Sequence, residues 1–398
     1  MRPENDSAGG SEQPFSWNRR KAALGVVLAL LLAGGAFAGI GELARFGTLE
    51  HSVSRANKLW LPVCLLGQLL AYLGYILAYR DAAQASGGPR FSFRTTTKVV
   101  VFGMGAAVLA ASVGGLAVDY WALRRTGTKR YVATRRVLAV GTIEWTVLAL
   151  YAVSAAVTIL LTGQRAPLGM VLGWLVAVPV CVTGALWLSS PPRVGRLLRH
   201  RVEQPARSTS RFSRGLRSLT RSLRSGLANS IAGVLLVRHI LSHPVRYRGG
   251  AIGYPIYWAG DMLTLYAAIR AFGGTVGIAP LILAYASGFV ISSLPLPAGG
   301  AGGVEATMAL ALHGVGVALA PALLAVFLYR IITFWLPIIP ALILIPSVRR
   351  LNWTLRSVPH TAPDSDEGFS FRAAGCDSRP NSAVRTSRPT ASGVPRGP

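Results

Sequence analysis

Long apolar runs separated by polar, mostly basic stretches dominate the chain. A spanning helix needs about 20 apolar residues, and eight runs approach that length: 22–41, 59–79, 99–118, 137–162, 168–189, 251–272, 277–294 and 318–346. The first follows "NRRK" and contains "AFA" at 36–38, which resembles a signal peptidase site. We interpret it as a retained helix, with a cleaved signal as the alternative. The pattern predicts an all-α polytopic membrane protein.

Composition agrees with this class. Of 398 residues, 52% are hydrophobic and only 14% are charged, with a mean hydropathy of +0.45. A soluble protein would be about 25% charged. Cys64, Cys181 and Cys376 suggest no disulfide framework, and the sequence predicts no metal site and no cofactor. Richness in Ala, Gly and Arg is typical of a GC-rich bacterial genome, so we expect a bacterial inner-membrane protein.

The formal net charge of +26 lies mostly in loops beside apolar runs. In that position it indicates membrane topology and contact with anionic lipid, not nucleic acid. The apolar runs define a membrane domain at 19–350, between polar, disordered ends at 1–18 and 351–398. Within it, the basic loop 190–250 contains an amphipathic segment, 207–227. Its arginines share one helical face, which suits an anionic membrane surface: Arg207, Arg211, Arg214, Arg217, Arg221 and Arg224. The alternative is a solvated helix packed on its own domain.

The distribution of charge also constrains topology. If all eight runs crossed, 119–136 and the basic loop would lie outside, against the positive-inside rule. If 99–118 and 277–294 instead enter and return to the same side, every basic loop and both termini become cytoplasmic. The sequence therefore predicts six crossings and two re-entrant segments.

A repeat supports the same arrangement. "SVGGLAVDYWALRRTG" at 112–127 and "PAGGAGGVEATMALALHG" at 297–314 each combine Gly-Gly, an acid, an apolar stretch and a closing Gly. Each precedes an apolar helix, with Arg136 and Trp145 in the first and Arg330 and Trp335 in the second. Inverted repeats that meet at broken helices are common in transporters.

The segment 292–306 predicts a helix break within the membrane. Prolines stop a helix, glycines allow close approach, and a new helix exposes N–H groups that attract anions. Glu305 falls in the first turn of that new helix, where a carboxylate complements the helix dipole. We expect a headgroup-binding patch here, built from Pro297, Gly299, Gly300, Gly302, Gly303 and Glu305. A simple helix break capped by Glu305 is the alternative.

Ionisable residues inside apolar runs extend this patch. Arg330 lies near the middle of 319–345, where a charge costs about 2.5–3.5 kcal/mol, so it needs a partner. Glu305 is the first candidate and Asp261 the second. Buried ion pairs are the structural alternative to binding. The remaining candidate substrate-binding residues are Trp258, Asp119, Arg136, Glu144 and Tyr329.

The stretch 294–316, followed by "LLAVFLYRIITFWLPII", resembles the lysylphosphatidylglycerol synthase transmembrane-region family of flippase-like proteins. Pro297, the glycines, Glu305, Tyr329, Arg330, Trp335 and Pro337 stand at the positions of the family motif, and the resemblance covers about 20–348. It implies movement of an aminoacylated phospholipid between leaflets. The soluble synthase domain has no counterpart in the polar tail, so synthase activity is not implied.

These features predict a non-enzymatic translocase for an anionic or aminoacylated lipid, whose headgroup crosses through a polar groove between the repeats. The alternatives are an accessory protein that binds an envelope-biosynthesis enzyme, and a lipid-modifying membrane enzyme. No hydrolase, Walker or metal-ligand motif favours the enzyme.

The predicted topology is testable by cysteine labelling in intact cells. Cysteines placed at Ser208 and Ser357 should resist a membrane-impermeant thiol reagent added from outside, because both positions lie in basic cytoplasmic segments. Labelling of either from outside would contradict the six-plus-two arrangement.

Overall fold

The computed structural model describes residues 56–85, 87–109, 113–188, 248–293 and 302–360, with isolated residues before 56. These ranges are all-α, as predicted, and contain no strand. The principal helices are α3 (Leu61–Gln84), α4 (Phe93–Leu109), α5 (Val113–Arg125), α6 (Arg130–Thr162), α7 (Leu168–Leu188), α10 (Arg248–Ala271), α11 (Ile278–Phe289), α12 (Gly303–Gly314), α13 (Leu319–Arg330), α14 (Ile338–Leu344) and α15 (Val348–Arg356).

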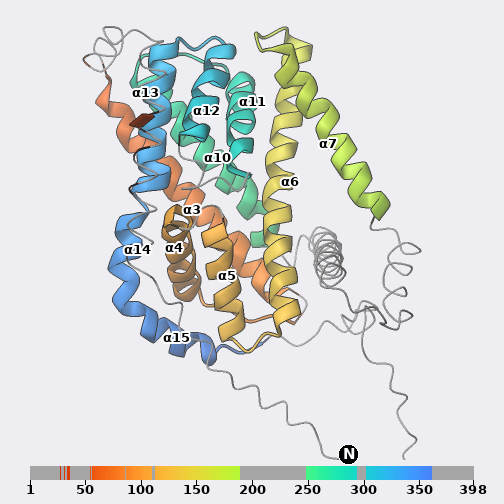
Figure 1. The fold of residues 1–398 in the computed structure, drawn as a ribbon, viewed down its shortest axis with the longest axis vertical. Helices are drawn as coiled ribbons and strands as arrows, with labels where there is room; N and C mark the ends of the chain where they lie inside the picture. Colours follow the sequence, from red (N-terminus) through yellow and green to blue (C-terminus); the bar gives the residue numbers. More distant parts are fainter. Residues whose placement is uncertain are drawn as a thin grey trace, which may run out of the picture.

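Two helical hairpins occupy opposite halves of the bundle. In Figure 1, α4 and α5 pack together in the lower half, whereas α11 and α12 pack together in the upper half. Each hairpin follows one long helix, α3 or α10, and precedes another, α6 or α13. The chain therefore folds as two successive units with the same helix order and opposite directions.

Four glycines hold these units together where α3 and α10 cross. Gly67 faces Gly260 and Gly74 faces Gly253, so the two helices run antiparallel. A Cβ atom at any of these positions would stand 2.5–2.7 Å from a carbonyl oxygen of the facing helix. Small residues allow such close backbone approach between membrane helices. Each pair is seven residues apart, which is two helical turns, so both lie on one face.

Hydrogen bonds join α3 and α10 on both sides of this crossing. The hydroxyl group of Thr264 donates to the Cys64 carbonyl at 3.1 Å, and the Gly250 N–H donates to the Asp81 carboxylate at 3.1 Å. Elsewhere each hairpin packs against the other unit, α11 on α6 and α4 on α14. Each unit therefore packs its hairpin against a helix of the other unit, so the two units fold together.

The helix that spans Leu319–Leu344 contains a π-helical turn near its middle. Between α13 and α14, Ile331–Trp335 forms a π-helical turn, closed by the Leu336 N–H donating to the Ile331 carbonyl at 2.8 Å. Pro337 follows, and it has no N–H for the ordinary helical bond. Such π-turns often occur at functional sites.

The described part contains three helices long and apolar enough to cross a membrane: Lys58–Gln84, Val132–Thr162 and Leu319–Leu344. Leu168–Gly184 and Ile278–Ser292 are shorter apolar helices. Helix α7 leans away from the bundle beyond α6 (Figure 1). An all-α polytopic membrane fold accounts for these lengths and for the many exposed leucine, valine and isoleucine side chains.

Positive charge gathers at one end of the bundle. The helix ends and connections there carry Arg90, Arg94, Arg124, Arg125, Lys129, Arg130, Arg135, Arg248, Arg350 and Arg356. The opposite end has Lys58, Arg165 and Arg270 among the described residues. The structure thus brings the basic segments 80–98, 119–136 and 348–356 to the same end, as the charge pattern requires. The hairpin α4–α5 starts from this end and α11–α12 from the other.

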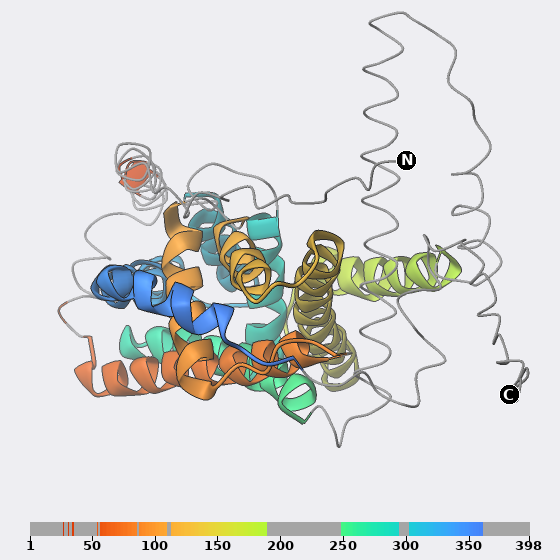
Figure 2. The same ribbon diagram turned by 90° about the horizontal axis from the view of Figure 1, so that it is seen from below.

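Two predicted boundaries differ from the structure. We placed each re-entrant segment within one apolar run, but each hairpin has two helical arms and extends to Arg125 and to Gly314. The second hairpin has α11 before the Pro/Gly segment and α12 after it. The folded part also continues past residue 350, since Leu351 and Leu355 of α15 are buried against α4 and α5. Figure 2 shows α15 crossing the base of the bundle.

Residues 357–360, which follow α15, also contact the rest of the protein. The Arg90 N–H donates to the Pro359 carbonyl at 2.9 Å, beside a bridge between Pro89 and His360. The predicted first helix at 22–41, the amphipathic segment 207–227 with its six arginines, and the ends 1–18 and 361–398 lie outside the described residues, apart from a few isolated positions in the first.

The glycine crossing gives a direct test of the fold. Gly74→Ala should destabilise the protein by about 1–3 kcal/mol, the typical cost of overpacking, because its Cβ meets the Gly253 carbonyl at 2.5 Å. Gly173→Ala on α7 is the control, since a Cβ there meets nothing within 4 Å. Thermal unfolding in detergent measures both; equal stability of the two variants would contradict the close crossing.

Candidate functional site

A polar cavity of about 360 Å³ lies between the two units, where the inner ends of both hairpins meet. Met104, Ala107, Gly115 and Leu116 come from the first hairpin, and Phe289 and Ser292 come from the second. The other lining residues belong to the long helices: Gln68, Ala71, Tyr72, Tyr75, Gly141, Glu144, Trp145, Tyr257, Asp261, Tyr329, Arg330, Thr333 and Phe334. The cavity therefore exists only once both units are assembled.

Arg330 is the principal cation of this cavity. Its Nε donates to the Glu305 carboxylate at 2.8 Å, and the side chain of Glu305 is fully buried, as predicted for this pair. The guanidinium also lies 4.0 Å from the centre of the Phe334 ring, on the π-helical turn. Nη2 of Arg330 is buried and has no hydrogen-bond partner among the described residues. The Nη2 amino group of Arg330 is therefore available to a ligand.

Glu305 has a second role at the start of α12. Its Oε2 accepts from the Gly302 N–H at 2.6 Å, so the carboxylate caps the helix that it also connects to Arg330. Gly302 has φ +84°, a backbone conformation that favours glycine. Glu305 therefore caps the start of α12, which was the structural alternative, and also forms the ion pair with Arg330. The side chain stands behind Arg330, outside the cavity lining.

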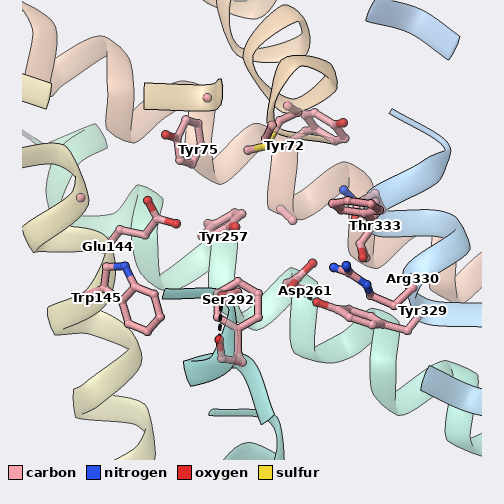
Figure 3. A pocket seen from close by; sticks show the side chains of 18 of the residues that line it. Tyr72, Tyr75, Glu144, Trp145, Tyr257, Asp261, Ser292, Tyr329, Arg330 and Thr333 are labelled. Carbon is pink, nitrogen blue, oxygen red and sulfur yellow. Dashed lines mark hydrogen bonds between the residues drawn. The ribbon is translucent and has the colours of Figure 1, made fainter. Parts of the chain in front are cut away.

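Asp261 holds the wall next to Arg330. Its Oδ2 accepts from the hydroxyl groups of Tyr285 and Tyr329, the latter at 2.6 Å. Asp261 is thus not the ion-pair partner of Arg330, which is Glu305. In Figure 3 the Asp261 carboxylate and the Arg330 guanidinium lie side by side at the cavity edge.

Glu144 occupies the opposite wall. Figure 3 shows its carboxylate turned into the cavity between Tyr75 and Tyr257. No donor of the described residues hydrogen-bonds to that carboxylate, whereas its backbone carbonyl accepts from the Trp258 indole N–H at 2.8 Å. The cavity therefore presents one guanidinium and two carboxylates to a ligand, surrounded by aromatic rings and hydroxyl groups.

The predicted site residues divide into four groups. Asp261, Glu144, Tyr329 and Arg330 line the cavity. Glu305 and Trp258 support it from behind, and Gly302 and Gly303 begin α12. Asp119 and Arg136 are buried and do not line the cavity, although Asp119 accepts a hydrogen bond from the lining residue Tyr75. Pro297, Gly299 and Gly300 lie outside the described residues.

Sequence reasoning missed most of the aromatic and hydroxyl lining, including Tyr72, Tyr75, Tyr257, Thr333 and Phe334. A signal existed in the repeat. Asp119 and Glu305 are 186 residues apart, as are Glu144 and Arg330, Tyr75 and Asp261, and the crossing glycines of α3 and α10. The counterpart of Arg330 is thus Glu144, not Arg136 as we predicted. Extending the short match at this interval would have led to Tyr75.

This architecture defines a helical membrane protein with two inverted units around a central polar cavity. The chain belongs to the family described as "Lysylphosphatidylglycerol synthase TM region", whose model matches residues 22–341. The family implies a role connected with membrane lipids. A search of curated proteins gave no significant match.

The buried ion pair can be tested by a double-mutant series. Glu305→Gln and Arg330→Gln should each destabilise the protein by about 3–5 kcal/mol, because each leaves one buried charge uncompensated. The double variant should recover much of that stability. Thermal unfolding and the folded fraction in detergent measure this; a double variant less stable than both single variants would contradict the pairing.

Proposed function

We propose that this protein is a lipid translocase of a bacterial inner membrane. It moves an anionic or aminoacylated phospholipid between leaflets. The headgroup passes through the central cavity while the acyl chains remain in the bilayer. The observation that carries this proposal is a cavity built from both inverted units and provided with unpartnered polar groups. Inverted repeats around a midplane site are a recurrent design of transporters.

The chemistry of the cavity suits a headgroup. The free Nη2 of Arg330 can bind a phosphate oxygen, and charge-assisted bonds of this kind are strong. An aminoacyl ammonium group would find carboxylates and the rings of Tyr257 and Trp145. The volume of about 360 Å³ is within the usual range of small-molecule sites, which is about 300–1,000 Å³.

The distribution of charge supports an orientation. The basic end of the bundle faces the cytoplasm, in accord with the positive-inside rule. The hairpin α4–α5 then enters from the cytoplasmic side and α11–α12 from the outside, both as re-entrant segments. Backbone that turns within the membrane is tolerated where protein or a cavity surrounds it.

A steric block tests this function without removing any polar group. Gly141 lines the cavity and a Cβ there meets nothing within 4 Å, so the side chain of Gly141→Leu should extend into open space and occupy part of the cavity. We expect translocation to fall at least about tenfold, equivalent to ~1.4 kcal/mol of added barrier. Gly173→Leu on α7 is the matched control and should not change the rate.

The measurement uses vesicles of phosphatidylethanolamine and phosphatidylglycerol that contain the purified protein. A fluorescent phosphatidylglycerol and its lysylated form serve as probes, and dithionite quenches whichever probe reaches the outer leaflet. If the wild-type protein moves neither probe faster than protein-free vesicles, the translocase proposal fails and the accessory-protein alternative gains support.

A further inference from the structure

The two units differ in charge at equivalent positions. In the second unit, Glu305 forms an ion pair with Arg330 at 2.8 Å. The counterparts in the first unit, at the same interval of 186 residues, are Asp119 and Glu144. Where one unit has an acid and a base, the other therefore has two acids. Burial and a neighbouring like charge each disfavour the ionised form of a carboxylate.

A tyrosine that is hydrogen-bonded to Asp119 lies in the same cavity as Glu144. Asp119 is only 2% exposed, and its Oδ2 accepts from the Tyr75 hydroxyl group at 3.4 Å. Tyr75 also lines the cavity into which the Glu144 carboxylate points (Figure 3). Tyr79, one turn further along α3, donates to the backbone carbonyl of Asp119 at 3.3 Å and does not line the cavity.

Among the described residues, Arg330 and Arg136 hydrogen-bond to groups other than this pair. Within the described ranges no ion pair joins Asp119 or Glu144 to an arginine or lysine, and Arg330 is bonded to Glu305. Arg136, on α6, donates to the Ala85 carbonyl at 2.8 Å. The other titratable groups near the pair are the hydroxyl groups of Tyr75 and Tyr79 on α3, of Tyr254 and Tyr257 on α10, and the carboxyl group of Asp261.

An unsatisfied group at the same place points to exchangeable protons or water. The Tyr254 hydroxyl group is fully buried and has no hydrogen-bond partner among the described residues. Its ring packs edge-on against that of Tyr75, with 6.1 Å between the ring centres. Buried polar groups are normally satisfied, so this hydroxyl group marks a position for a mobile partner.

We infer that Asp119 and Glu144 share a proton through Tyr75 and couple lipid translocation to proton movement. This inference rests on the proposed translocase function and assigns its energy source. It gives the two acids a role distinct from headgroup binding at Arg330.

The transfer conserves charge. When Glu144 is protonated, its proton passes to the oxygen of Tyr75, directly or through water in the cavity, while Tyr75 releases its own proton to the Asp119 carboxylate. Tyr75 is unchanged, Glu144 becomes a carboxylate and Asp119 becomes neutral. The cycle closes when Asp119 releases this proton on one side of the membrane and Glu144 takes up another from the other side through the cavity. A carboxylate at Glu144 and a neutral carboxyl group there present different charges to a headgroup in the cavity, so each step of the lipid can be linked to one proton.

Two matched substitutions separate this relay from packing. Tyr75→Phe removes the hydroxyl group between the acids, and Tyr79→Phe removes a hydroxyl group that reaches only the Asp119 backbone. In vesicles of the composition above, a pH difference of two units should drive the fluorescent phosphatidylglycerol to one leaflet. The limit is about a hundredfold per coupled proton, because each unit of pH is a factor of ten.

We expect wild-type protein and Tyr79→Phe to show this accumulation, and Tyr75→Phe to lose it. Equal behaviour of the two variants would overturn the inference, as would translocation that ignores the pH difference or follows a sodium gradient instead. Translocation that equilibrates the probe without accumulation would leave the proposed function standing while this inference fails.

A measurement without lipid transport tests the pair independently. Infrared titration of the detergent-purified protein follows the carboxyl band that disappears in Glu144→Gln. If the two acids share a proton, they titrate in two separated steps, and Asp119→Asn should move the titration of the Glu144 band to lower pH. An unmoved band in a folded Asp119→Asn protein would overturn the inference even if the protein transports lipid.

Discussion

The close crossing of α3 and α10 is the contact on which the rest of the structure depends. Two antiparallel helices can approach this closely only where neither has a side chain, and Gly67, Gly74, Gly253 and Gly260 provide that face. Because the crossing is antiparallel, the hairpin that follows each helix starts from the opposite end of the bundle. The inner ends of the hairpins therefore meet in the middle, and the cavity forms there.

The backbone around the cavity is symmetric because of this crossing, but the charged residues around it are not. Equivalent positions hold Tyr75 and Asp261, and Glu144 and Arg330, so each polar wall faces a wall of different character. A symmetric backbone thus surrounds an asymmetric site. Among the described residues, one half stabilises Glu305 with the guanidinium of Arg330, whereas in the other half Asp119 accepts from the hydroxyl group of Tyr75. This difference allows the two halves to respond differently to a charged ligand.

Much of the fold could be predicted from local signals. Apolar run length identified the helices, and the charge of the connections indicated that one end of the bundle is basic. The prediction that Glu305 pairs with Arg330 also followed from local physics, because a charge in an apolar helix needs a partner and a helix start suits a carboxylate. The hairpin bounds were less accessible, since a run of apolar residues does not show whether it holds one helix or one arm of a pair.

The sequence by itself therefore determined the class of protein, the position of the helix break and the residues that could not remain unpaired. Only the tertiary structure decided which of them share the cavity. Asp119, Arg136, Glu144 and Asp261 are all ionisable residues in or beside apolar runs. Glu144 and Asp261 line the cavity, whereas Asp119 and Arg136 are buried outside its lining. The physical reason is that the cavity lies between helices far apart in the chain. Its lining follows from the crossing geometry of α3 and α10, which no single segment encodes.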